Sequence, residues 1–187
     1  TLDGITRTLN DFTVLVCDTQ GPLSIAGVMG GAESEVTQET RNVLLEGASW
    51  DYINIRRTIN AQKLDSEAAY RFSRGVHPQL AQPGVLRALE LMRQWSDGTV
   101  AKGLVDAYPS PIKDPLVEVV PSDVKRWLGI DLNSSEIADI LSRLEFQVQV
   151  KGEVVQALTP DHRLDIHEGV IGKADLMEEI ARIYGYD

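Results

Sequence analysis

Short apolar runs along the first hundred residues predict a sheet. Residues 12–18 and 23–29 are rich in β-branched side chains, and Gln20-Gly21-Pro22 between them predicts a tight turn. Residues 43–48 form a third apolar run that contains a carboxylate, and residues 99–108 form a fourth, strand-like run. We therefore expect a partial, mixed β-sheet in this part of the chain.

Between the third and fourth runs the apolar period becomes helical. It predicts helices over 53–64, 66–76 and 85–95. Asp65 or Ser66 is expected to cap the second of these helices, because short polar side chains satisfy the free amides of a helix start. Helices packed on a small sheet are typical of an α+β fold.

A proline-rich segment separates this region from the rest. Three prolines between Pro109 and Pro115 interrupt both the strand and the helix period. We place a domain boundary there, which gives domains over residues 1–113 and 114–187.

The second domain also alternates between strand and helix patterns. The predicted elements are strands over 116–120, 146–150 and 153–158 and helices over 123–129, 136–146 and 175–186. In the last helix Leu176, Ile180 and Ile183 recur at three-to-four spacing, and Gly185 ends it. The sequence predicts a compact, small α+β domain.

Composition excludes several classes of protein. The chain has 187 residues, 43% of them hydrophobic, and a net charge of −10. No run approaches the ~18 apolar residues of a membrane span, and the start lacks a secretory signal. One cysteine, Cys17, excludes an internal disulfide, and three histidines are few for a structural zinc site. A cytoplasmic chain without a membrane partner is expected. It begins without methionine, and we interpret it as a piece of a longer protein.

Charge is distributed unevenly. Residues 1–114 carry about −3 and residues 115–187 about −7, whereas the stretch from Arg56 to Arg93 is locally basic. If one surface meets a phosphate backbone, it is this stretch. The alternative, favoured by composition alone, is that these arginines are solvated or form local ion pairs.

Three features of the first domain are candidates for chemistry. The glycine-rich segment 26–36 permits close backbone approach to a ligand, or simply a turn, and matches no phosphate-loop motif. Glu46 follows three apolar residues, so it either binds a ligand or forms an ion pair with Arg56 or Arg57. Small polar groups near Ser66 either cap a helix or bond a substrate.

A carboxylate cluster marks the second domain. Asp175, Glu178 and Glu179 have i, i+3, i+4 spacing, and Asp165 precedes them. Oxygen ligands of this kind suit Mg²⁺. The alternative is that acidic residues at a helix start complement the helix dipole.

Three segments together resemble one family from end to end. VMGGAESEVTQETRNVLLEGA, IRRTINAQKLDSEAAYRFSRGV and DLMEEIARIYGYD are similar to the β subunit of bacterial phenylalanyl-tRNA synthetase. The resemblance implies the C-terminal part of the tRNA-editing domain, followed by a winged-helix-like domain. It also implies a heterotetramer of two α and two β subunits that charges tRNA(Phe) using ATP and Mg²⁺, with the ATP site on the α subunit.

The resemblance further implies roles for individual residues. Glu46 would recognise the hydroxyl of tyrosine on mischarged tyrosyl-tRNA(Phe), which water would hydrolyse, and no catalytic nucleophile is evident. The implied editing-pocket residues are Gly27, Gly30, Glu46, Ser66 and Ala68. The implied Mg²⁺ ligands are Asp165, Asp175, Glu178 and Glu179, with a longer interval after Asp165 than the commoner family form has.

Two other classes of function compete with this interpretation. The chain is alternatively a scaffold and nucleic-acid-binding module without its own activity, in which two successive helices of the second domain form a helix-turn-helix element. The acidic charge of that domain argues against strong DNA binding. A free-standing Mg²⁺-dependent hydrolase is the third alternative.

Overall fold

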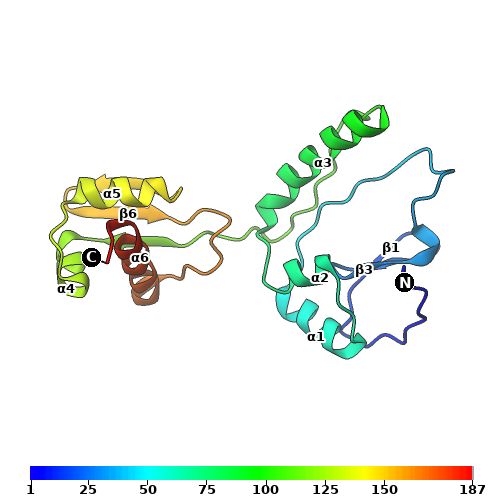
Figure 1. Ribbon diagram of the computed structural model, residues 1–187, viewed down its shortest axis with the longest axis horizontal. Coiled ribbons are helices and arrows are strands. Elements are labelled where there is room, and N and C mark those ends of the chain that lie inside the picture. The colour runs from blue at the N-terminus through cyan, green and yellow to red at the C-terminus, as the bar shows by residue number, and fades with distance from the viewer. Residues whose placement is uncertain (187) are drawn as a thin grey trace. The chain divides into compact units, whose positions relative to one another are not determined.

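Two compact units make up the chain. The computed structural model describes residues 1–186, with one unit over Thr1–Val105 and the other beginning at Asp106. Each unit combines helices with one three-stranded sheet (Figure 1), which confirms the predicted α+β class. Residues 106–115, where we expected the domain boundary, contain no helix or strand. Among the described residues, no helix is long and apolar enough to cross a bilayer.

The sheet of the first unit is an antiparallel meander. Its strands are β1 (Leu15–Cys17), β2 (Pro22–Ile25) and β3 (Met29–Gly30). Leu15 pairs with Ile25 and Ser24 pairs with Gly30. The turn predicted at residues 20–22 is present, but the strands are shorter than expected. All described pairs are antiparallel, whereas the sequence favoured a mixed sheet.

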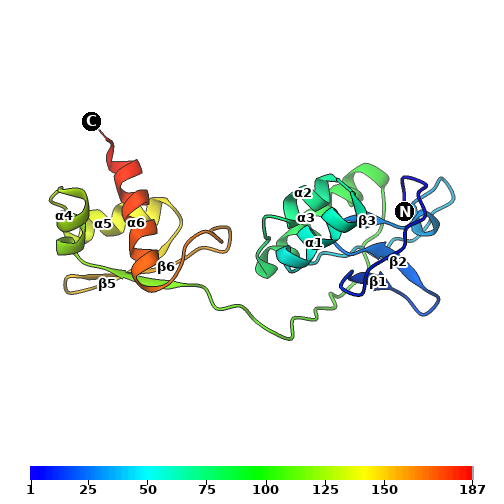
Figure 2. The same cartoon turned by 90° about the horizontal axis from the view of Figure 1, so that it is seen from below.

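Helices pack beside this sheet (Figure 2). They are α1 (Tyr52–Gln62), α2 (Glu67–Phe72) and α3 (Ala81–Ser96), with 3₁₀ turns at Ala32–Ser34 and Pro78–Leu80. Asp51 caps α1 and Ser66 caps α2. The core of the unit contains Ile25, Val28, Ile55, Leu64 and Ala69. The short sheet contributes few residues to it, and α1 and α2 supply Ile55 and Ala69.

The strands predicted over 43–48 and 99–108 do not form. Both segments lack helix and strand, and Leu44 is 99% exposed. A strand needs a neighbour to satisfy its backbone groups, and within residues 1–186 neither segment has one. Glu46, which follows three apolar residues in this segment, is exposed rather than buried.

The second unit has a better developed core. Its sheet has the order β4 (Leu116–Val119), β6 (Val154–Leu158), β5 (Gln147–Lys151), and Val117 pairs with Ala157. Alternate residues of β4 and β6 are buried, as period-two patterning requires. Gly152, at φ +64°, makes the tight turn of the β5–β6 hairpin.

Three helices cover one face of this sheet (Figure 2). They are α4 (Pro121–Leu128), α5 (Ser134–Arg143) and α6 (Gly169–Tyr184). Asn133 and Glu136 form a reciprocal capping box at α5. The helix α6 begins six residues before the predicted start. Asp175, Glu178 and Glu179 therefore lie in its middle, and the helix-dipole alternative for them is wrong.

Candidate functional site

A cavity of about 310 Å³ lies between the segment before α1 and the helix α3. Apart from one carboxylate, the side chains that line it are apolar, and two of them are aromatic. The lining residues are Gly27, Leu45, Glu46, Gly47, Ala48, Trp50, Phe72, Val76, Leu80, Ala81, Gly84, Val85 and Ala88. Two of the five predicted pocket residues, Gly27 and Glu46, therefore meet in one cavity.

Gly27 permits the cavity wall to form. It occupies the turn between β2 and β3 with φ +65°, a conformation that other residues adopt at a cost. A Cβ atom on Gly27 would lie 2.5 Å from Trp50 Cδ1 and 3.0 Å from Ile55 Cδ1. The absence of a side chain therefore lets Trp50 pack directly against the turn.

Gly47 holds the opposite wall against α3. A Cβ atom there would lie 2.3 Å from Val85 Cγ2 and 3.0 Å from the carbonyl oxygen of Ala81. Ser49 anchors the same segment, since its hydroxyl donates to the carbonyl of Val76 at 2.6 Å. Gly47, Trp50 and Phe72 were not among the residues predicted for the site. The position of Gly47 directly after Glu46 in the sequence was the one available indication for it.

Glu46 is exposed and forms no ion pair among residues 1–186. The two arginines proposed as its partners are engaged elsewhere. Arg56 Nε donates to the carbonyl of Ser73 at 2.6 Å, and the guanidinium of Arg57 lies 4.3 Å from the centroid of the Phe12 ring. The structural ion-pair alternative for Glu46 is thus not observed, and its carboxylate is available to a ligand.

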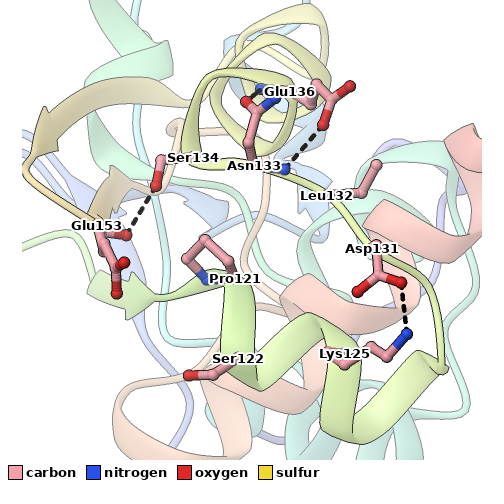
Figure 3. A pocket seen from close by; sticks show the side chains of 9 residues that line it. All are labelled: Pro121, Ser122, Lys125, Asp131, Leu132, Asn133, Ser134, Glu136 and Glu153. Atoms are coloured by element: carbon pink, nitrogen blue, oxygen red, sulfur yellow. Dashed lines mark hydrogen bonds and ion pairs between the residues drawn. The ribbon is translucent and has the colours of Figure 1, made fainter.

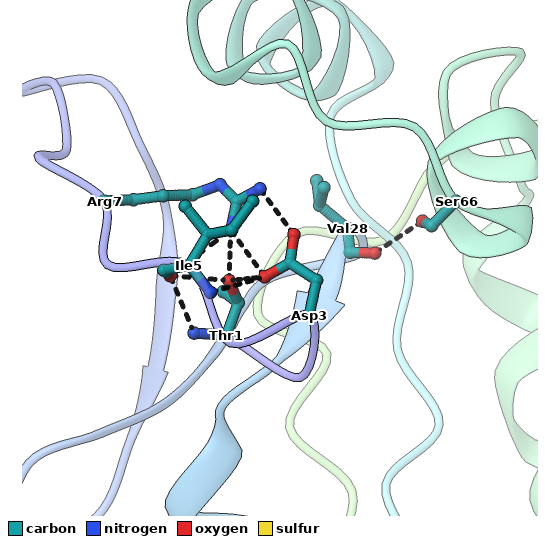
Figure 4. A network of polar contacts seen from close by, with 6 residues as sticks. All are labelled: Thr1, Asp3, Ile5, Arg7, Val28 and Ser66. Carbon is teal, nitrogen blue, oxygen red and sulfur yellow. Dashed lines mark hydrogen bonds and ion pairs between the residues drawn. The ribbon is translucent and has the colours of Figure 1, made fainter.

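The remaining three predicted pocket residues lie outside the cavity lining. The hydroxyl of Ser66 donates to the carbonyl of Val28 at 2.5 Å (Figure 4) and accepts from the amide of Ala69 at 3.0 Å. Ala68 is half-buried on α2, and a Cβ atom on Gly30 would lie 3.1 Å from Leu2 Cδ1. Ser66 therefore acts here as a helix cap and as a link between α2 and the β2–β3 turn.

A larger concavity, about 710 Å³, lies at the starts of α4 and α5 in the second unit (Figure 3). Several of its polar groups bond to one another. Lys125 pairs with Asp131 at 2.5 Å, and the hydroxyl of Ser134 donates to the carbonyl of Glu153 at 3.0 Å. It contains none of the predicted site residues, so we regard it as a surface groove.

Two of the four predicted metal ligands, Asp165 and Glu179, take part in an ion-pair network. Arg163 donates to both carboxylate oxygens of Asp165, at 2.8 and 2.7 Å, and to Glu179 Oε1 at 2.8 Å. Arg182 bonds Glu179 Oε2. The hydrogen bonds from Arg163 lower the pKa of Asp165. Burial raises the pKa of Glu179, but the bonds from Arg182 and Arg163 outweigh it, so this pKa is also lowered.

The other two carboxylates are separate from this network. Asp175 Oδ2 accepts from the backbone amide of His167 at 2.9 Å and lies 3.1 Å from His167 Nδ1. Glu178 is exposed. Among the described residues, no three of the four carboxylates bring oxygens within 4.8 Å of one another. The oxygen donors are of the type Mg²⁺ prefers, but as they lie they do not form a cage for one ion, because arginines compensate Asp165 and Glu179.

Comparison with known proteins assigns the chain to a family. A family model for the B3/4 domain matches residues 1–97, more than half of the sequence. The chain belongs to the B3/4 domain family. A model for the tRNA synthetase B5 domain matches residues 117–186. We therefore call the two units the B3/4 unit and the B5 unit.

The match to curated relatives extends over the whole chain. Its 187 residues are 38% identical to the phenylalanine–tRNA ligase β subunit of Salinibacter ruber, 39% identical to that of Moorella thermoacetica and 37% to that of Halalkalibacterium halodurans. The chain spans 22–23% of the length of these relatives. The resemblance expected from the sequence is confirmed, with a B3/4 domain followed by a B5 domain.

The cap in the B3/4 unit gives a first prediction. Ser66→Ala is expected to lower the free energy of unfolding of this unit by about 1–2 kcal/mol, because it removes both hydrogen bonds of the hydroxyl. Ser66→Thr keeps the hydroxyl and is expected to lose less than half as much. Denaturant titration of both variants checks this, and equal losses in the two would contradict the capping role.

Proposed function

We propose that this chain is part of the β subunit of a phenylalanine–tRNA ligase, which joins phenylalanine to tRNA(Phe). The support is the identity along its whole length to relatives of that name and the shared order of B3/4 and B5 domains. As part of this proposal, the complete protein works with an α subunit, tRNA(Phe), ATP and Mg²⁺. Binding of Mg²⁺ by Asp165, Asp175, Glu178 and Glu179 stays a prediction.

The B3/4 unit contributes editing, the hydrolysis of tyrosyl-tRNA(Phe). The observation that carries this proposal is the cavity, which combines an apolar, aromatic lining with one unpaired carboxylate, Glu46. The lining suits an aromatic ring, and the carboxylate suits a hydroxyl at the end of that ring. Tyrosine has this hydroxyl and phenylalanine lacks it.

Discrimination follows from hydrogen bonding. A site that bonds a substrate hydroxyl favours the hydroxylated side chain over its analogue, since only the former makes the bond. Bonds to charged groups contribute about 1.5–3 kcal/mol. Glu46 therefore selects tyrosine for removal and leaves correctly charged phenylalanyl-tRNA intact.

Water is the attacking group in this proposal. The residues that line the cavity include no serine, threonine, cysteine, lysine or histidine. Among the described residues that line it, Glu46 is the one whose side chain is able to act as a covalent nucleophile, and in this proposal its carboxylate is engaged by the tyrosine hydroxyl. Glu46 thus recognises the substrate, and groups of the tRNA or of the backbone orient the water.

The test is hydrolysis of tyrosyl-tRNA(Phe) and phenylalanyl-tRNA(Phe) by the complete protein with its α subunit. Glu46→Ala is expected to reduce the preference for the tyrosyl substrate by about tenfold to a hundredfold, in line with the loss of one charged hydrogen bond. Glu35→Ala, at an exposed acid without a described ion pair on the same long segment, is the matched control and is expected to behave as the wild type.

Two outcomes would overturn the proposal. If Glu46→Ala keeps the full preference for tyrosine, Glu46 is not the recognition group. If the wild type hydrolyses neither substrate, the B3/4 unit does not edit, and the chain acts as a scaffold that positions tRNA.

A further inference from the structure

Two tyrosine–arginine pairs lie on the exposed side of α1 and α2. On α1 the guanidinium of Arg56 lies 4.9 Å from the centroid of the Tyr52 ring. At the end of α2 the guanidinium of Arg74 lies 3.7 Å from the centroid of the Tyr70 ring. Tyr52 is 43% exposed and Tyr70 is 55% exposed. Each ring therefore contacts a cation and still has surface open to solvent.

Hydrogen bonds join the two pairs into one surface. Arg56 Nε donates to the carbonyl of Ser73 at 2.6 Å, and Ser73 directly precedes Arg74. Arg74 Nη1 donates to the carbonyl of Tyr70 at 2.7 Å. We call these four side chains the tyrosine–arginine surface. Its guanidinium groups are oriented by neutral carbonyl oxygens.

The positive charge of this surface is not compensated. Within residues 1–186, neither Arg56 nor Arg74 has a carboxylate within 4.0 Å, and the same holds for neighbouring Arg57. Other arginines of the B3/4 unit do have one, such as Arg7 with Asp3 and Arg93 with Glu90. In a chain of net charge −10, a group of unpaired guanidiniums is open to an external anion.

We propose that the tyrosine–arginine surface binds an unpaired RNA strand. Guanidinium groups would bond its phosphates, and its bases would stack on the open faces of Tyr52 and Tyr70. Positive charge combined with exposed aromatic rings is the arrangement that proteins use for single strands, whose bases are free to stack. In a duplex the bases already stack on one another, so the rings would gain nothing. The proposal rests on the proposed function only in that tRNA supplies the strand.

The experiment measures binding of fluorescent single-stranded oligouridylate to the full 187-residue chain. Tyr70→Leu is expected to weaken binding by about tenfold, because it removes one stacking platform, whereas Tyr70→Phe keeps the ring and is expected to bind like the wild type. Arg74→Ala is expected to weaken binding and to reduce the slope of log affinity against log salt by about 0.7, the contribution of one phosphate contact on a single strand. Arg126→Ala, an exposed arginine of the B5 unit, is the charge-matched control and is expected to have no effect.

Three results would overturn the proposal. They are equal affinity of Tyr70→Leu and wild type, equal affinity for the strand and for a duplex of the same length, and full competition by inorganic polyphosphate at equal phosphate concentration. Thermal denaturation of each variant confirms that it is folded. Because the binding assay contains no aminoacylated tRNA, the measured affinity does not depend on whether the unit edits. Strand binding with no hydrolysis contradicts only the proposed function, and hydrolysis with no strand binding contradicts only this surface.

Discussion

Gly172→Ala is expected to lower the free energy of unfolding of the B5 unit by about 3 kcal/mol, at the upper end of the usual cost of overpacking. Gly172 is buried in α6. A Cβ atom there would lie 2.0 Å from the carbonyl oxygen of His167 and 2.9 Å from Val117 Cγ2 on β4. The amide of His167 is bonded to Asp175 of the same helix, which limits how far the His167 carbonyl can shift, and relief of the contact with Val117 requires α6 to move away from the sheet.

Gly84→Ala in α3 is the matched control. It is also a helical glycine, but a Cβ atom on it would meet nothing within 4 Å. Alanine there is expected to stabilise the B3/4 unit by about 0.5–1 kcal/mol, the difference in helix propensity. Hydrogen exchange of the β6 amides measures the stability of the B5 unit, and exchange of the α3 amides measures the stability of the B3/4 unit. Unchanged protection of β6 in Gly172→Ala would show that α6 does not pack as closely as described.

The B5 unit was predictable because its signals are local and agree with one another. Alternation in β4 places Val117 and Val119 in the core, and the hairpin turn at Gly152 brings β6 beside β5. The helix α6 was predicted too short. Its first turns contain Gly169 and Gly172, and glycine disfavours a helix unless close packing compensates, which the sequence does not show.

In the B3/4 unit the sequence was less informative. The apolar run at 43–48 has the composition of a strand, but a strand forms only if another strand satisfies its backbone groups. In the described chain β1 pairs only with β2, and no strand reaches this run. The hydrophobic pattern of a segment shows that it could pair as a strand, but it does not show whether another strand lies beside it.

The candidate site also contains residues that the sequence predicted and residues that it did not. Gly27 and Glu46 were expected from the resemblance, and both line the cavity. Gly47, Trp50 and Phe72 were not expected, because they meet only when the segment before α1 packs on α2 and α3. Long-range packing of this kind has no period along the chain, so a sequence pattern does not reveal it.

Glu179→Gln is expected to lower the free energy of unfolding of the B5 unit by about 2 kcal/mol near neutral pH. Glu179 is only 7% exposed and holds Arg163 and Arg182 through different oxygens. Glutamine keeps the size of the side chain but loses the charge that compensates two guanidiniums. Removing one partner of a buried ion pair costs about 3–5 kcal/mol, and the cost is smaller here because Arg163 keeps its bidentate bond to Asp165.

Glu178→Gln is the control that makes this result specific. Glu178 is adjacent on α6, exposed and outside the ion-pair network. Its replacement is therefore expected to change the free energy of unfolding by less than about 0.5 kcal/mol. Denaturant titrations with a chelator and with added Mg²⁺ separate the two roles assigned to Glu179. An ion-pair role predicts the same loss under both conditions, because the arginines need no metal. A loss seen only with Mg²⁺, and shared by Glu178→Gln, would instead favour the metal site that the family resemblance implies, and would require Arg163 to leave Glu179 when the ion binds.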